Sequence, residues 1–151
     1  GAMEAVETGI GISNTLCWSP NRRHFYFGDT LKNEIRVYDY DRDSGRIAGG
    51  TPFFAGFDRG FPDGSAMDSA GYLWNCRFGG GCIVRVAPDG TIDRVIDMPV
   101  SNITTCTFGG AELRTLYVTS AASDQGERLA GSLFAISVDV PGMDENIFRL
   151  G

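Results

Sequence analysis

The chain reads Phe61-Pro62-Asp63-Gly64-Ser65-Ala66-Met67-Asp68 near its middle and, after a Ser69-Ala70-Gly71 turn, continues into Tyr72-Leu73-Trp74. The same plan starts again at residues 12–19 and at residues 103–108: an apolar stretch, a polar turn, then a short aromatic or β-branched run. Runs of this kind between turn residues are typical of short strands. The sequence therefore predicts one structural unit that occurs three times.

The spacing of the three units indicates the fold. With Leu16, Ser65 and Cys106 in register, the units are 49 and 41 residues apart. A strand-built repeat of this length is typical of a β-propeller blade. We therefore expect an all-β protein with three consecutive blades, which are too few to close a ring.

Strand signals fill each unit. Residues 34–40 alternate cleanly, with Ile35 and Val37 on one face and Arg36 and Tyr38 on the other. Further strands are expected at residues 25–29, 72–76, 82–86, 116–120 and 132–136, with a turn at 41–45, a polar loop at 121–131 and a lead-in strand or arm at 4–11.

Composition narrows the class of protein. The 151 residues allow one domain, expected at residues 4–151, and Gly1-Ala2-Met3 is interpreted as a cloning remnant. The net charge of −6 argues against nucleic acid or an anionic membrane as a partner. The sequence shows no signal peptide and no long apolar run, so we expect a cytoplasmic protein.

The four cysteines do not indicate a disulfide scaffold or a zinc site, because no Cys-x-x-Cys occurs. Cys17 and Cys106 lie in strand-like apolar stretches and are expected to be buried. Cys76 and Cys82 flank a glycine-rich turn, so a disulfide between them stays open as an alternative.

Two polar residues occupy equivalent places in the repeat. Asn14 and Asp63 each lie two residues before the register point, and Thr104 is their equivalent in the third unit. In a propeller, equivalent positions of successive blades face one axis. A carboxylate and an amide oxygen there suit calcium, magnesium or manganese, although calcium needs further oxygens from water or another chain. The alternative is that both side chains only cap the inner strands through backbone hydrogen bonds.

Four motifs together carry a resemblance: Ile12-Ser13-Asn14, Pro62-Asp63-Gly64, residues 104–110 and residues 116–120, in that order and at fitting separations. Over residues 11–138 the chain resembles the C-terminal half of the regucalcin (senescence marker protein)/gluconolactonase family. Members of that family are six-bladed β-propellers that bind one divalent cation in the central channel and hydrolyse sugar lactones. The resemblance implies that this chain is half of such a propeller.

The resemblance also assigns residues. It implies that Asn14 and Asp63 are metal ligands, with calcium as the expected ion and magnesium, manganese or zinc as alternatives. The family's third ligand, a Glu, and its substrate-orienting Arg and Asn belong to the half that this chain does not match. Glu4 and Glu7 do not match that Glu. Asp63 is also the candidate catalytic residue, because a ligand carboxylate can position or deprotonate the attacking water.

The leading interpretation is a metal-dependent, gluconolactonase-type hydrolase, or a piece of one, that acts on a small sugar lactone. The alternative is a non-catalytic propeller domain that binds a divalent metal or another protein. Three blades leave open strand edges and flanks, which invite pairing with another chain. We therefore expect a homodimer or a strand-exchanged oligomer.

Overall fold

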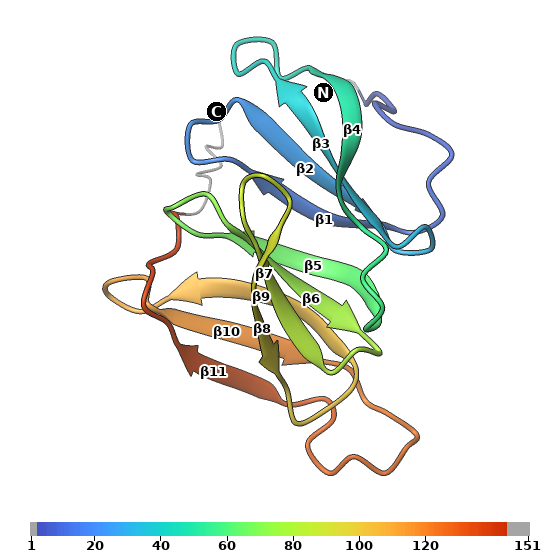
Figure 1. Cartoon of the computed structure of the whole chain (residues 1–151), viewed down its shortest axis with the longest axis vertical. Coiled ribbons are helices and arrows are strands. Elements are labelled where there is room, and N and C mark those ends of the chain that lie inside the picture. Colours follow the sequence, from blue (N-terminus) through green and yellow to red (C-terminus); the bar gives the residue numbers. More distant parts are fainter. Residues whose placement is uncertain (1–2, 145–151) are drawn as a thin grey trace.

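The computed structural model describes residues 3–144, which are built from strands and loops (Figure 1). Gly1 and Ala2 of the expected cloning remnant lie outside the described residues, as do residues 145–151 of the expected 4–151 domain. Between residues 3 and 144 there is no helix long and apolar enough to cross a membrane.

Within residues 3–144, eleven strands form three antiparallel sheets, and each sheet is one blade. The first blade contains β1 (Ser13–Trp18), β2 (His24–Asp29), β3 (Glu34–Tyr40) and β4 (Ile47–Ala55). The second contains β5 (Phe61–Met67), β6 (Leu73–Phe78), β7 (Cys82–Val86) and β8 (Ile92–Asp97). The third, within the described residues, contains β9 (Ile103–Gly109), β10 (Thr115–Ser120) and β11 (Leu133–Ser137).

The first strand of each blade is its inner strand. β5 lies between β1 and β9 and contacts both of them, so the three inner strands run side by side (Figure 1). Within each sheet the strands follow one another in chain order away from this inner edge. The prediction of an all-β partial propeller with three blades is confirmed.

The sequence did not predict the two outer strands β8 and β4, and the composition of β4 shows one reason. β4 carries Gly49 and Gly50 and then Pro52, residues that weaken a strand signal. β4 is the edge strand of its sheet. A proline is tolerated there because the open side of an edge strand has no neighbouring strand to hydrogen-bond. Gly50 is required by packing, because a Cβ there would lie 2.3 Å from the Tyr38 ring.

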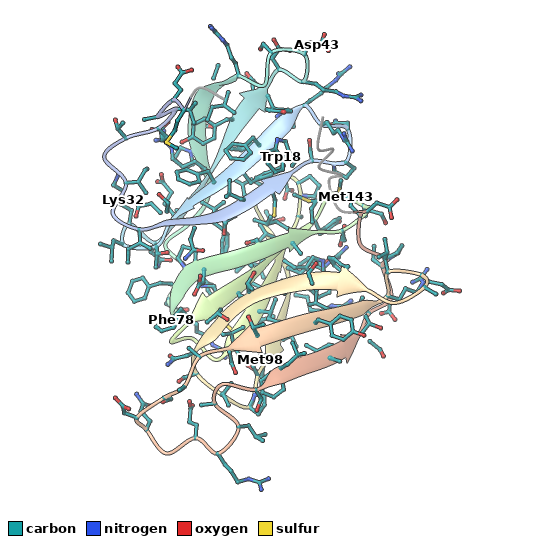
Figure 2. All side chains as sticks on the ribbon, turned by 180° about the vertical axis from the view of Figure 1, so that it is seen from behind. Trp18, Lys32, Asp43, Phe78, Met98 and Met143 are labelled. Carbon is teal, nitrogen blue, oxygen red and sulfur yellow. The ribbon has the colours of Figure 1, made fainter. Side chains whose placement is uncertain are left out.

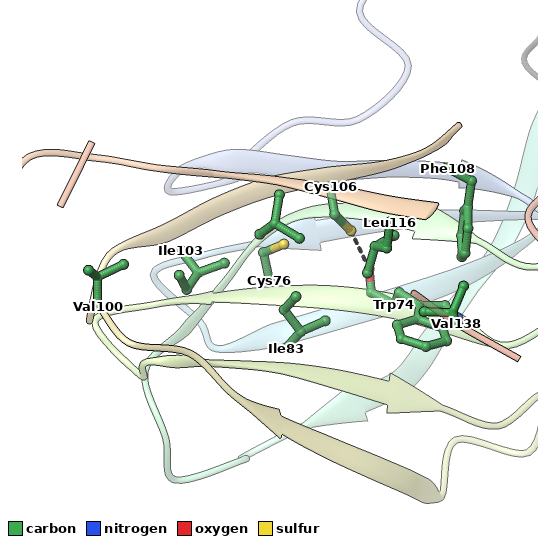
Figure 3. Packing of buried hydrophobic residues seen from close by; sticks show 10 residues of the cluster. Trp74, Cys76, Ile83, Val100, Ile103, Cys106, Phe108, Leu116 and Val138 are labelled. Carbon is green, nitrogen blue, oxygen red and sulfur yellow. Dashed lines mark hydrogen bonds between the residues drawn. The ribbon is translucent and has the colours of Figure 1, made fainter. Parts of the chain in front are cut away.

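Two apolar clusters hold the blades together. One joins the first and second blades and contains Cys17, Tyr26, Ile35, Phe54, Met67, Leu73, Cys82, Val84 and Val86. The other joins the second and third blades and contains Trp74, Cys76, Ile83, Val100, Ile103, Cys106, Phe108, Leu116, Val118 and Val138 (Figure 3). The middle strands β6 and β7 contribute to both clusters, because successive side chains of a strand point to opposite faces.

The cysteines are part of this packing. Cys76 belongs to one cluster and Cys82 to the other, so their thiols lie on opposite faces of the second blade. All four cysteines fall within the described residues, all are buried, and none forms a disulfide. The alternative of a Cys76–Cys82 disulfide is therefore wrong. The expected burial of Cys17 and Cys106 is confirmed.

A buried carboxylate closes the turn between β5 and β6. Asp68 is fully buried, and its Oδ1 accepts hydrogen bonds from the backbone N–H groups of Ala70 and Tyr72, both at 3.0 Å. Its Oδ2 accepts from Trp74 Nε1 at 2.9 Å and from Arg85 Nη2 at 2.7 Å. One side chain thus fixes the turn, a core tryptophan and a buried guanidinium.

Replacing Asp68 by Ala should lower the free energy of unfolding by about 3 kcal/mol, because it leaves the buried Arg85 charge without its closest partner. Asp89→Ala is the matched control. Asp89 also closes a turn, through Thr91, but it is exposed, so its loss should cost less than about 1 kcal/mol. Urea denaturation of both variants measures the difference, and equal losses would contradict the role assigned to Asp68.

Candidate metal centre on the inner strands

Each inner strand has an irregularity at the same level. The pairing register shifts between Asn14 and Leu16 in β1, between Pro62 and Ser65 in β5, and at Thr104 in β9. A β-bulge re-aims the side chains beside it and is common next to functional sites. The positions that the sequence repeat made equivalent therefore share one structural feature.

In β1 the bulge is built on a strained residue. Thr15 is buried and has φ of 47°, a conformation that is rare for a β-branched side chain. Its hydroxyl donates to the Asp63 carbonyl oxygen at 2.6 Å and lies 2.9 Å from Ser65 Oγ. The residue after Asn14 is therefore tied to the backbone of Asp63 in the next blade.

In β5 the bulge depends on a glycine. A Cβ on Gly64 would lie 2.1 Å from Thr105 Oγ1 and 2.4 Å from Thr105 Cβ. Only a residue without a side chain lets β5 approach β9 this closely. The glycine of the Pro62-Asp63-Gly64 motif is therefore a steric requirement of the inner strands.

The structure brings Asn14 and Asp63 together. Both side chains are half-buried, and a hydrogen bond from the Asn14 amide favours the charged form of the Asp63 carboxyl. Burial outweighs this bond and that from the Gly64 N–H, so the pKa of Asp63 is raised above its ordinary value. Among residues 3–144 no basic side chain forms an ion pair with this carboxylate.

The remaining contacts of Asn14 are with Thr15 beside it and with Thr30, which follows β2. Its Oδ1 accepts from the Thr15 backbone N–H at 3.3 Å, and its Nδ2 lies 3.3 Å from Thr30 Oγ1. The capping contacts of the alternative interpretation are thus present, and they hold the side chain beside Asp63. Metal ligation by Asn14 and Asp63 stays a prediction.

Other candidates do not join the pair. The Thr104 hydroxyl lies 2.6 Å from Thr119 Oγ1, within the third blade. Glu4 is exposed, and Glu7 lies near Tyr38, whose pKa is raised by burial and by this carboxylate. Residues 3–144 contain no group of three or more His, Cys, Asp or Glu side chains able to hold a metal.

The donor chemistry of the pair nevertheless fits a hard cation. It offers one carboxylate and one amide oxygen, without sulfur or nitrogen ligands, and the half-buried carboxylate forms no ion pair with any residue that the structure describes. Oxygen donors of this kind suit calcium, magnesium or manganese. Two side chains are an incomplete set, and further oxygens are needed.

A hollow of about 130 Å³ lies farther along the inner strands. Its walls come mainly from β1, β5 and β9 and include Trp18 and Met143 (Figure 2). Neither Asn14 nor Asp63 lines it. Met143 reaches this place because the chain after β11 returns to the second blade, where Gly142 bridges to Asp68.

Sequence reasoning missed two residues beneath the pair. Asn75 and Arg77 are almost fully buried in β6, with Asn75 Nδ2 3.0 Å from Ser65 Oγ and Arg77 Nη1 3.2 Å from Asn75 Oδ1. The available signal was that these polar residues alternate with apolar ones along the strand. An ordinary strand with one solvent-exposed face has the same pattern, and the sequence does not show that a neighbouring blade covers the polar face.

Replacing Gly64 by Ala should lower the free energy of unfolding by about 1–3 kcal/mol, because the added methyl group overlaps Thr105. In the double variant with Thr105→Gly, most of that overlap is removed. Denaturation of the single and double variants should therefore show a coupling of at least about 0.5 kcal/mol. Additive losses would contradict the steric argument.

Comparison with known proteins finds relatives that match nearly the whole chain. The family model described as SMP-30/Gluconolactonase/LRE-like region matches residues 1–122. A pentonolactonase from Haloferax volcanii is 36% identical over 156 residues, covering 96% of this chain and 54% of that protein. A 6-deoxy-6-sulfogluconolactonase from Pseudomonas putida is 38% identical over 148 residues, covering 92% of this chain and 50% of that protein.

Solved structures agree on the fold. A calcium-binding protein, regucalcin, from Agrobacterium tumefaciens superposes with a TM-score of 0.86 at 31% identity, covering 93% of this chain and 50% of that one. The chain thus spans about half the length of the relatives it matches.

Proposed function

Since the chain belongs to the SMP-30/gluconolactonase/LRE-like family, we propose that it supplies part of the metal centre of a sugar-lactone hydrolase. The observation that carries this proposal is the meeting of Asn14 and Asp63 on neighbouring inner strands, without a basic partner for the carboxylate among the described residues. Two relatives are named as lactonases, which supports the substrate class.

The roles of the residues follow from their chemistry. Asn14 and Asp63 would hold the cation, for which calcium is the expected ion and magnesium, manganese or zinc are alternatives. A divalent cation so bound supplies polarisation of the lactone carbonyl and stabilisation of negative charge on its oxygen. The Asp63 carboxylate can orient or deprotonate a water molecule whose oxygen attacks the carbonyl carbon. The ring C–O bond then breaks, the ring oxygen takes a proton, and a hydroxy acid results.

A second candidate function is a non-catalytic domain that binds a divalent metal or a protein. The observation that favours it is the short donor set, since the described residues bring only two candidate ligands together. Both functions share the Asn14–Asp63 pair and differ in lactone turnover. The cytoplasmic location expected from the sequence stays a prediction.

Divalent cation binding should depend on both side chains. Asp63→Asn should abolish the calorimetric response to calcium and manganese, because it removes the site's only charge. Asn14→Ala removes a neutral oxygen and should weaken binding less. Asp41→Asn, in an exposed turn remote from the inner strands, is the control and should bind as wild type. No heat with wild type, or unchanged affinity in Asp63→Asn, would leave only the capping interpretation.

Hydrolysis of gluconolactone by this chain alone should be barely faster than in buffer, with calcium, zinc or manganese added. The third ligand and the substrate-orienting side chains implied by the resemblance have no counterpart in this chain, and positioning and charge stabilisation supply most of such a rate enhancement. A colorimetric assay of acid release tests this. Clear turnover that Asp63→Asn abolishes would contradict it and would establish a complete enzyme.

We also propose that the chain self-associates, as a homodimer or by strand exchange. The outward face of the third blade carries Leu133, which is 66% exposed, and Tyr117, which is 39% exposed. Apolar surface and open edges of this kind favour pairing with another chain. Light scattering at micromolar concentration should give twice the chain mass of 16.3 kDa, and Leu133→Asp should reduce it. A wild-type species at the single-chain mass would refute the proposal.

A further inference from the structure

A buried polar network lies directly behind the two bulges. We propose that Thr15, Asn75 and Arg77 form a positioning network that holds Asn14 and Asp63 in place. This inference deepens the proposed function and rests on it for its metal-binding readout.

The network starts at a buried cation. Arg77 is 1% exposed, and among residues 3–144 its guanidinium donates to uncharged oxygens alone. These acceptors are Asn33 Oδ1, Asn75 Oδ1 and the carbonyl oxygens of Phe57, Arg59 and Gly60. Burial lowers the pKa of Arg77 to about 10, so it remains charged at neutral pH. A buried charge satisfied by several fixed acceptors makes a rigid anchor.

Arg77 determines which atoms donate and which accept in the hydrogen bonds that lead through Asn75 to Thr15. Arginine can only donate, so Asn75 must turn its oxygen toward Arg77 and its NH₂ group toward the inner strands. That NH₂ group lies 3.0 Å from Ser65 Oγ and 3.4 Å from Thr15 Oγ1. With a donor on that side, the Thr15 hydroxyl is free to give its single proton to the Asp63 carbonyl oxygen at 2.6 Å.

The same bonds account for the strain in β1. Thr15 keeps its unusual φ of 47° while its hydroxyl is bound across the blades to Asp63 and Ser65. Strain of this kind persists only where surrounding contacts over-determine the backbone. The backbone N–H of Thr15 also donates to Asn14 Oδ1 at 3.3 Å, so a fixed Thr15 backbone holds the Asn14 side chain.

Arg77 also acts from the other side of Asp63. Its bonds to the carbonyl oxygens of Arg59 and Gly60 fix the backbone that enters β5. The guanidinium therefore holds the chain before Asp63 directly and the chain at Asp63 through Asn75. Outer partners of this kind typically change metal affinity by about 10–100-fold when they are lost.

Two variants of Thr15 test the network. Thr15→Val keeps the shape and removes the hydroxyl, whereas Thr15→Ser keeps the hydroxyl. In manganese titrations followed by electron paramagnetic resonance, Thr15→Val should bind at least about tenfold more weakly than wild type, and Thr15→Ser should bind within about threefold of it. Thr119→Val is the matched control, because its hydroxyl bonds only to groups of the third blade.

A second readout needs no metal. The Gly64 amide bonds to the Asp63 carboxylate, so its hydrogen exchange reports how firmly Asp63 is held. In metal-free protein, Thr15→Val should speed exchange at Gly64 by about tenfold or more, while the Ile83 amide of the core keeps its protection. Thr15→Ser and Thr119→Val should exchange like wild type at both places.

The outcomes are distinct. Unchanged Gly64 exchange in Thr15→Val would overturn the positioning role, as would a Thr15→Ser protein that behaves like Thr15→Val. If wild type binds no manganese, the proposed metal site fails, and the exchange measurement still decides whether the network positions Asp63.

Discussion

The rest of the structure depends on one constraint: the second blade is apolar on both faces. Leu73, Val84 and Val86 pack toward the first blade, while Trp74 and Ile83 pack toward the third. Each of these five side chains is at most 1% exposed, so another sheet must cover each face of the second blade. Face-to-face packing of three twisted sheets then places β1, β5 and β9 next to one another, and only this adjacency lets residues 49 positions apart meet.

Close packing of the inner strands constrains the backbone at the candidate site. Position 64 must be a glycine because a side chain there would overlap Thr105 of β9, and Thr15 adopts a strained backbone conformation. Both devices re-aim the residue before them, which is Asp63 in one strand and Asn14 in the other. A half-buried carboxylate then faces an amide instead of a basic side chain, an arrangement more useful for binding a cation than for stability.

Much of the fold, and the two residues of the candidate site, could be predicted from the sequence. The alternation of residues 34–40 and the repeat spacing predicted β3 and the blades, and the family resemblance selected Asn14 and Asp63. Strand β4 was not predictable, because Gly49, Gly50 and Pro52 obscure a strand that an edge position and the Tyr38 ring permit. The roles of Asn75 and Arg77 were hidden for a different reason. Their burial and partners come from blade packing, which local sequence does not encode.

We propose that the inner strands present Asn14 and Asp63 to one cation. Anomalous diffraction from crystals soaked in manganese tests it most directly. A manganese peak is expected at about 2.0–2.6 Å from an Asp63 carboxylate oxygen and Asn14 Oδ1. A map without a peak at this place, with Asn14 still bonded to the Thr15 N–H and Asp63 to the Gly64 N–H, would contradict it.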